Sequence, residues 1–137
     1  MSQENVEIVK AVFDAWNAGD LDRLLDQWDP NVVHKSAEGW PEPGPFVGRE
    51  AVMGWFKQLR DTWDADALEP IDFTAVADHV VVRLRWRGVV RGAEPSMEFT
   101  GVYTVRRGKV VFVELFWDHA EALEAVGLSA QDAHSDS

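Results

Sequence analysis

The chain has 137 residues, enough for one domain with a substantial core, and a net charge of −11. So acidic a surface repels phosphate backbones and anionic lipids, which excludes nucleic-acid binding through a basic face and disfavours membrane adhesion. The absence of cysteine excludes disulfides, thiolate catalysis and thiolate metal sites.

Two helices are predicted at the start of the chain. Apolar residues recur at helical spacing over residues 3–17, and Asn17-Ala18-Gly19 ends that helix. Asp20 then caps a second, shorter helix whose last apolar position is Trp28. Pro30 is expected to stop it.

A short strand, a loop and a third helix are expected next. Residues 31–37 predict the strand. Residues 38–47 hold Trp40 among prolines and predict a stiff loop. The third helix begins at Gly48 and carries its apolar residues on one face, namely Val52, Phe56, Leu59 and Trp63.

After Asp64 the apolar period changes from helical to alternating. Four β-rich runs joined by turn signals are predicted over residues 71–76, 79–90, 97–106 and 109–117. Asp118 and Glu121 have the spacing of a capping box and open a last helix, which Gly127 closes. Residues 1–128 are therefore expected to form a single domain, and the polar tail 129–137 is expected to be disordered.

The order of elements, α-α-β-α-β-β-β-β-α, predicts an α+β fold with helices on one face of a mostly antiparallel sheet. Five segments in this order resemble the SnoaL-like branch of the nuclear-transport-factor-2-like superfamily, and the resemblance covers about residues 3–128. The segments are residues 17–22, 29–34, 48–52, 108–111 and 121–128. The resemblance implies a cone-shaped apolar pocket inside a curved sheet, and a homodimer built by the other sheet face.

Steroid-isomerase chemistry of the kind found in this superfamily is excluded by the residues present. That reaction needs a carboxylate base, a tyrosine and a protonated acid. An alignment through residues 17–22 puts Ser36 at the base position and Val12 at the tyrosine position. The acid position falls at Thr100 or Gly101. None of these side chains can do the required work.

Two other superfamily mechanisms are matched only in part. Limonene-epoxide-hydrolase-like enzymes hold a water between two aspartates and an arginine, whereas the middle strands here offer only Arg83, Arg85 and Arg87. SnoaL-type cyclases use an acid–base aspartate on the last long strand, with histidine partners. His34 matches one of these histidines, but the aspartate maps onto Leu115.

Strand alternation assigns residues to the two faces of the sheet. If Trp117 faces the pocket, as the family match implies, then the residues on the pocket side are Val82, Leu84, Trp86, Val113 and Leu115. The arginines of the 79–90 strand then lie on the outer face. We interpret them as a cross-strand charge ladder that Glu114 joins, with the binding of an acidic ligand as the alternative. Phe112 and Phe116 also face outward there, which predicts the dimer interface.

His34 is the candidate catalytic residue. An imidazole with an ordinary pKa near 6.5 suits proton transfer at neutral pH, and a hydrogen-bonded structural histidine is the alternative. Burial without a nearby acid is expected to lower its pKa and keep it neutral at pH 7. Ser36 lies two residues on and could orient a ligand or a water.

The candidate ligand contacts are mostly aromatic. Seven Trp and seven Phe favour a generous cavity, although a bulky core is the plainer interpretation. Tyr103 is the only tyrosine, and it either donates to a ligand oxygen or packs. Trp40 is expected to cover the mouth of the pocket. The full set is Trp16, Ser36, Trp40, Trp86, Tyr103, Leu115 and Trp117.

Two functions remain open. One is a cofactor-free isomerase, cyclase or dehydratase that acts on a small apolar substrate through His34. The other is a non-catalytic module that binds a small apolar ligand. Against the enzyme stands the lack of a predicted inward-facing carboxylate. The four scattered histidines predict no metal, and the absence of a glycine-rich phosphate loop predicts no nucleotide cofactor. The N-terminal residues lack the pattern of a secretion signal, so a cytoplasmic location is expected.

Overall fold

A computed structural model describes residues 2–40, 44–63 and 65–128 of the chain. The predicted disordered tail lies outside these ranges. The described residues form helices α1 (Ser2–Ala18), α2 (Leu21–Asp26), α3 (Arg49–Thr62) and α4 (His119–Ala125). The strands are β1 (Trp28–Lys35), β2 (Phe46–Val47), β3 (Ala65–Val76), β4 (His79–Val89), β5 (Ser96–Arg106) and β6 (Lys109–Phe116). None of these helices is long and apolar enough to cross a membrane.

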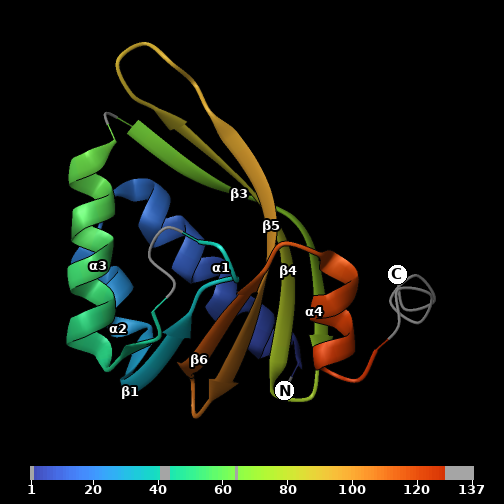
Figure 1. The fold of residues 1–137 in the computed structure, drawn as a ribbon. Coiled ribbons are helices and arrows are strands. Elements are labelled where there is room, and N and C mark those ends of the chain that lie inside the picture. The colour runs from blue at the N-terminus through green and yellow to red at the C-terminus, as the bar shows by residue number, and fades with distance from the viewer. Residues whose placement is uncertain (1, 41–43, 64, 129–137) are drawn as a thin grey trace.

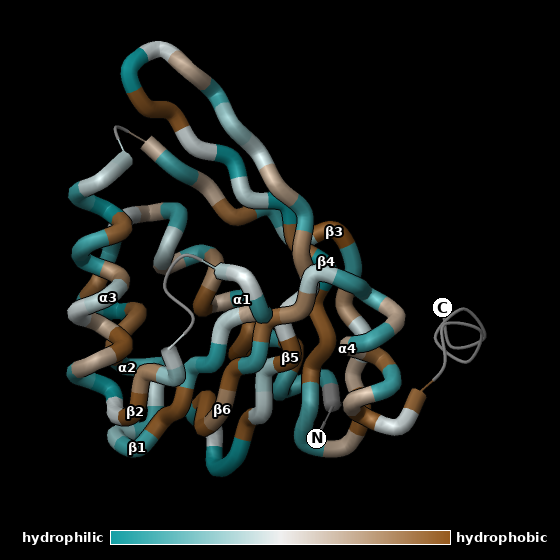
Figure 2. Tube along the Cα trace, viewed as in Figure 1, coloured by the Kyte–Doolittle hydropathy of each residue, from teal (hydrophilic) through white to brown (hydrophobic). Residues whose placement is uncertain are grey.

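The strands form one sheet in the order β2-β1-β6-β5-β4-β3, in which β1 and β6 run parallel and all other neighbours antiparallel. The sheet curves, and α1, α2 and α3 lie on its concave side (Figure 1). This arrangement confirms the predicted α+β cone. Figure 2 shows hydrophobic and hydrophilic residues mixed along β5 and β6 without strict alternation, and on β6 the four residues Val110–Val113 are all apolar.

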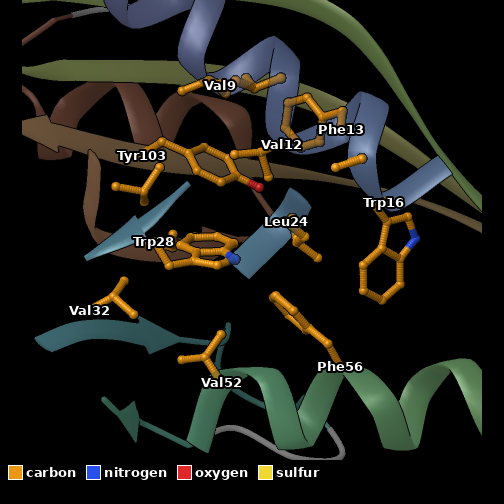
Figure 3. Close-up of a cluster of buried hydrophobic side chains, with 14 of the residues drawn as sticks. Val9, Val12, Phe13, Trp16, Leu24, Trp28, Val32, Val52, Phe56 and Tyr103 are labelled. Carbon is orange, nitrogen blue, oxygen red and sulfur yellow. The ribbon is translucent and has the colours of Figure 1, made fainter. Parts of the chain in front are cut away.

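The two long helices bury one apolar face each against the sheet. On α1 the buried side chains include Val9, Phe13 and Trp16. On α3 they include Val52 and Phe56, as the helical spacing predicts. Figure 3 shows side chains from both helices meeting around the ring of Trp28, which β1 places between them.

The second helix is shorter than predicted, because Trp28 and Pro30 belong to β1. α2 ends at Asp26, and the Gln27 carbonyl already accepts from the backbone N–H of Val110 on β6 at 2.9 Å. Pro30 is tolerated inside the strand because the pairing with β6 shifts register between Trp28 and Val33. A proline at such an irregularity removes no ladder hydrogen bond.

β3 begins six residues before the predicted start, at Ala65 instead of residue 71. Pro70 lies within the strand, at a register shift between Pro70 and Asp72, and the pairing with β4 continues on both sides of it. The predicted loop also contains a strand, since Phe46–Val47 pairs with Val33 and His34 of β1.

The prediction that all helices cover one face is wrong for α4, which packs on the outer face. Its residues Ala122 and Leu123 form a second small core with Val81 and Val102. Phe116 packs against this cluster, so it is not left facing solvent as expected. The start of α4 is as predicted, because the Asp118 carboxylate accepts from the backbone N–H of Ala120 at 2.8 Å.

The arginines of β4 form a cross-strand ladder on the outer face, but Glu114 is not their partner. Arg83 and Arg85 pair with Glu98 of β5 at 3.6 and 3.9 Å. Arg87 pairs with Glu69 of β3 at 3.0 Å. Glu114 lies on β6, one strand too far away, and pairs with Lys35 of β1 at 3.6 Å. The strand order therefore decides the partners.

Candidate functional site

A cavity of about 320 Å³ lies between the concave face of the sheet and helices α1 and α3. All seven tryptophans of the chain lie on its wall. Trp16 comes from α1, Trp55 from α3, and Trp28 and Trp86 from strands, so residues far apart in sequence build one aromatic surface. A cavity of this size and polarity is suited to a small, largely apolar molecule.

Strand alternation places most of the predicted ligand contacts. Trp86, Tyr103, Leu115 and Trp117 line the cavity, as do Trp16, Trp40 and His34. Val82, Leu84 and Val113 are buried in the core on the same side of the sheet. Ser36 is buried but is not part of the cavity wall.

His34 presents its ring to the cavity inside an aromatic surround. Its side chain is 4% exposed. The rings of Trp55 and Phe56 contact it edge to face, with centroids 4.9 and 5.8 Å away. Among the described residues, Nδ1 has no hydrogen-bond partner. Burial lowers the pKa of His34 from 6.5 to about 3. The imidazole is therefore neutral at pH 7.

Tyr103 lies in the same row of the sheet as His34. Both residues pair with Val113, which separates them by two strand spacings, or about 10 Å between backbones. The Tyr103 ring leans over Gly101, where an added Cβ would lie only 2.8 Å from Cε1 of the ring. Burial raises the pKa of the Tyr103 hydroxyl, which is neutral and able to donate.

Two further polar atoms on the wall lack partners. The indole nitrogens of Trp28 and Trp55 are buried, and neither has a hydrogen-bond partner among the described residues. In Figure 3 the Trp28 nitrogen and the Tyr103 hydroxyl point in the same direction. An unpaired buried polar group costs about 1–3 kcal/mol. Each nitrogen exposes less than 1 Å², so an acceptor on a bound molecule would meet it only after the neighbouring rings move.

Asp66 is a cavity residue that the sequence analysis missed. Its side chain is 3% exposed. Oδ2 accepts from the indole N–H groups of Trp16 at 2.7 Å and Trp86 at 3.3 Å, and Oδ1 accepts from Arg60 Nη1 at 3.2 Å. The expectation that no carboxylate faces inward is therefore wrong. Extending the alternation of β3 back through Leu68, which also lines the cavity, would have found it.

Trp40 and Trp117 stack at one edge of the cavity. Their ring centroids are 4.9 Å apart, with an angle of 22° between the planes. Trp117 Nε1 donates to the Glu38 carbonyl at 2.9 Å, which ties the segment 38–40 to the end of β6. Trp40 also contacts Phe99, at 5.5 Å between centroids. Residues 41–43 of the predicted covering loop lie outside the described residues.

The other histidines in the described ranges lie away from the cavity. His79 and His119 are each 2.9 Å from a threonine hydroxyl, of Thr104 and Thr100 respectively. Burial, followed by the charge of Arg83, lowers the pKa of His119. Within residues 2–40, 44–63 and 65–128, no three His, Asp or Glu side chains converge as a metal site would need.

Comparison with known proteins identifies a domain match. A model of the SnoaL-like domain matches residues 9–113, about three quarters of the chain. No curated protein matches by sequence.

Several solved structures share the fold. An NTF2-like protein of unknown function from Burkholderia pseudomallei has a TM-score of 0.75 and 22% identity, over 90% of this chain and 98% of that one. TerC, co-crystallised with polyporic acid, has a TM-score of 0.75 and 22% identity over 90% and 97%. A putative polyketide cyclase from Sinorhizobium meliloti has a TM-score of 0.67 and 25% identity over 80% and 93%.

Proposed function

Because this chain belongs to the SnoaL-like domain family, we propose that it binds one small, planar, largely apolar molecule that carries a hydrogen-bond-accepting oxygen. The observation that carries this proposal is the set of unpaired polar atoms in the aromatic cavity. The indole N–H groups of Trp28 and Trp55 have no partner among the described residues, and each exposes less than 1 Å², so a guest oxygen reaches them once the neighbouring rings shift slightly. A ketone or quinone oxygen would accept from them and remove their desolvation cost.

Planarity follows from the shape of the walls. The cavity is bounded mainly by ring systems, and aromatic faces make their best contacts with flat guests in stacked or edge-to-face arrangements. Its volume of about 320 Å³ suits a molecule of two or three fused or linked rings. The crystal structure of TerC with polyporic acid supports the proposal, since it concerns a protein of the same fold co-crystallised with a small molecule.

The binding test compares two probes that differ in one oxygen, 1-tetralone and tetralin. Calorimetric titration of the wild-type protein should give measurable binding of both, with 1-tetralone favoured by about three- to tenfold, as one neutral hydrogen bond provides. Replacing both Trp28 and Trp55 with Phe keeps the rings, removes the donors, and should abolish the preference. Binding of neither probe contradicts the proposal.

Acid–base catalysis through His34 is the second candidate. Nδ1 of His34 has no partner among the described residues, but the low pKa makes the ring a weak base, so proton transfer requires that the anion formed on the bound molecule stabilise the imidazolium. Tyr103, on the same face of the sheet, has a neutral hydroxyl that could donate to the developing oxyanion. The corresponding reactions are isomerisation, cyclisation or dehydration without a cofactor. Putative polyketide cyclases among the proteins of this fold support the same class.

Exchange of carbon-bound protons distinguishes catalysis from simple binding. In D₂O, a base at His34 would remove a proton from C2 of bound 1-tetralone, the enolate oxygen would accept hydrogen bonds, and deuterium would return to C2. We expect exchange above the buffer rate in the wild type, and its loss in His34→Phe with tetralone still bound. If the wild-type protein exchanged the C2 protons only at the buffer rate, catalysis through His34 would be excluded and ligand binding would be the sole proposed function.

A further inference from the structure

The carboxylate of Asp66 lies on the opposite wall of the cavity from His34. Asp66 is on β3 and His34 is on β1, and three strands separate these two in the sheet order. A guest that touches both walls must therefore extend across the cavity. The polar atoms at the two ends differ, because Trp55, which contacts His34, carries an unpaired N–H donor, whereas Asp66 offers only acceptors. The unpaired Nε and Nη2 of Arg60, beside Asp66, do not belong to the cavity wall.

The carboxylate retains room for one more donor. An ionised carboxylate has about four lone-pair sites. Three are used, by the indoles of Trp16 and Trp86 on Oδ2 and by Arg60 on Oδ1. Since these three donors come from α1, β4 and α3, the carboxylate is held from several sides and cannot turn away. The remaining site, on Oδ1, belongs to a side chain that lines the cavity.

The charge around Asp66 decides which donor fits. Arg60 neutralises the carboxylate and also lies over the Trp16 ring, with its guanidinium carbon 4.3 Å from the ring centroid. An ammonium guest would meet this fixed cation at short range and would bury an unbalanced positive charge. A carboxylate guest would face Asp66 itself. A neutral hydroxyl donates one hydrogen bond and adds no charge.

We propose that Asp66 anchors a hydroxyl group of the cavity's ligand, so that the ligand is a hydroxylated planar molecule with its accepting oxygen at the opposite end. This inference rests on the proposed binding function and adds the second polar group of the substrate class. Asp66 acts here as a specificity-determining residue for binding and takes no part in proton transfer.

The test uses three probes with one carbon skeleton, namely tetralin, 5,6,7,8-tetrahydro-2-naphthol and protonated 2-aminotetralin, titrated into the protein by calorimetry. The naphthol should bind about tenfold more tightly than tetralin, because a hydrogen bond to a charged acceptor is stronger than a neutral one. The ammonium should bind no better than tetralin.

Substitutions at Asp66 test whether its carboxylate causes the preference for the naphthol over tetralin. Asp66→Asn should reduce the naphthol advantage to about threefold or less, while tetralin still binds. Because this change leaves Arg60 as a partly buried cation without its carboxylate partner, the double variant Asp66→Asn/Arg60→Gln repeats the measurement without that charge. Glu69→Gln is the matched control, since it makes the same acid-to-amide change on β3 at a residue that pairs with Arg87 outside the cavity wall, and it should keep the preference.

Each outcome has a distinct meaning. An unchanged naphthol advantage in the folded double variant overturns the role of Asp66, and so does tightest binding of the ammonium. Either result leaves the binding function in place as long as tetralin and 1-tetralone bind. If no probe binds the wild type, the proposed function and this inference fail together.

Discussion

At the scale of single residues, His34 makes the stability of the protein sensitive to acid. Its pKa is about 3 in the folded chain and near 6.5 when unfolded. Above pH 6.5 both states are neutral and His34 has no effect. As pH falls from 6.5 towards 3, the unfolded state takes up a proton that the folded state refuses, so stability is lost at about 1.4 kcal/mol per pH unit.

We therefore predict that wild type loses about 2 kcal/mol more than His34→Phe between pH 6.5 and 4.5. Urea unfolding at both pH values measures this. The variant is the control for the 24 acidic residues, which titrate in both proteins. Equal losses, or an NMR titration giving His34 a pKa near 6.5, would contradict the burial that the structure shows.

Gly101 provides a second prediction, since its missing side chain makes the space that the Tyr103 ring occupies. A methyl group there would lie 2.8 Å from Tyr103 Cε1 and 3.3 Å from Leu115 Cδ2. Gly101→Ala should push the ring into the cavity and lower stability by about 1–3 kcal/mol. Gly54→Ala is the matched control, because Gly54 has open space in α3 and should gain about 0.5–1 kcal/mol. If Gly101→Ala and Gly54→Ala changed the free energy of unfolding in urea by similar amounts, the packing argument for Gly101 would be refuted.

The sequence predicted the cavity residues wherever a strand was recognised and missed them where it was not. Alternation from Trp117 placed Leu115 and Trp86 on the inner face, because the period of two is a local property. Asp66 was missed because the strand was predicted to begin only at residue 71. Its three partners also lie on other elements, as the indole of Trp16 is 50 residues away. Such contacts depend on tertiary packing, and the periodicity of apolar residues along the sequence carries no information about it.

At the scale of elements, the segment 38–40 depends on Trp117 for its position over the cavity edge. Trp117 is 47% exposed, so its removal should cost the core little, about 1 kcal/mol or less. Trp117→Ala loses both the stack on Trp40 and the hydrogen bond to Glu38, whereas Trp117→Phe loses only the bond. We expect faster amide exchange at Trp40 and weaker binding of tetralin in the Ala variant, with a smaller change in the Phe variant. An unchanged amide exchange rate at Trp40 in Trp117→Ala would show that the segment 38–40 keeps its position without Trp117.

The element boundaries show where sequence reasoning stops. The helix starts that are capped by a side chain, Asp20 for α2 and Asp118 for α4, were predictable because the capping residue and the N–H group that it accepts from are close in sequence. The starts of β1 and β3 were not, since each strand begins before a proline, Pro30 or Pro70, that lies at a register shift inside the strand. The sequence also did not predict that α4 packs on the outer face of the sheet. This position follows from contacts with Val81 and Val102 on strands that are distant in sequence.

At the scale of the whole molecule, we predict a homodimer through the part of the outer sheet face that α4 leaves uncovered. Val33 and Phe112 are partly buried neighbours there, on β1 and β6. Phe116 no longer supports this interface, because it packs on α4. Sedimentation equilibrium at micromolar concentration should give twice the 15.4 kDa chain mass.

Net charge makes this association dependent on salt. Each chain carries −11, so a dimer brings two strongly acidic molecules together, and their repulsion is screened over about 8 Å at physiological ionic strength. Raising the salt from 0.05 to 0.5 M should therefore tighten the dimer, whereas an interface held by ion pairs would weaken. Phe112→Lys should give a folded monomer. Ile71→Lys, on the far strand β3 at a residue that is 47% exposed, should leave the dimer intact. A 15.4 kDa species alone at every salt concentration would exclude the dimer, and equal dissociation by both variants would place the interface elsewhere.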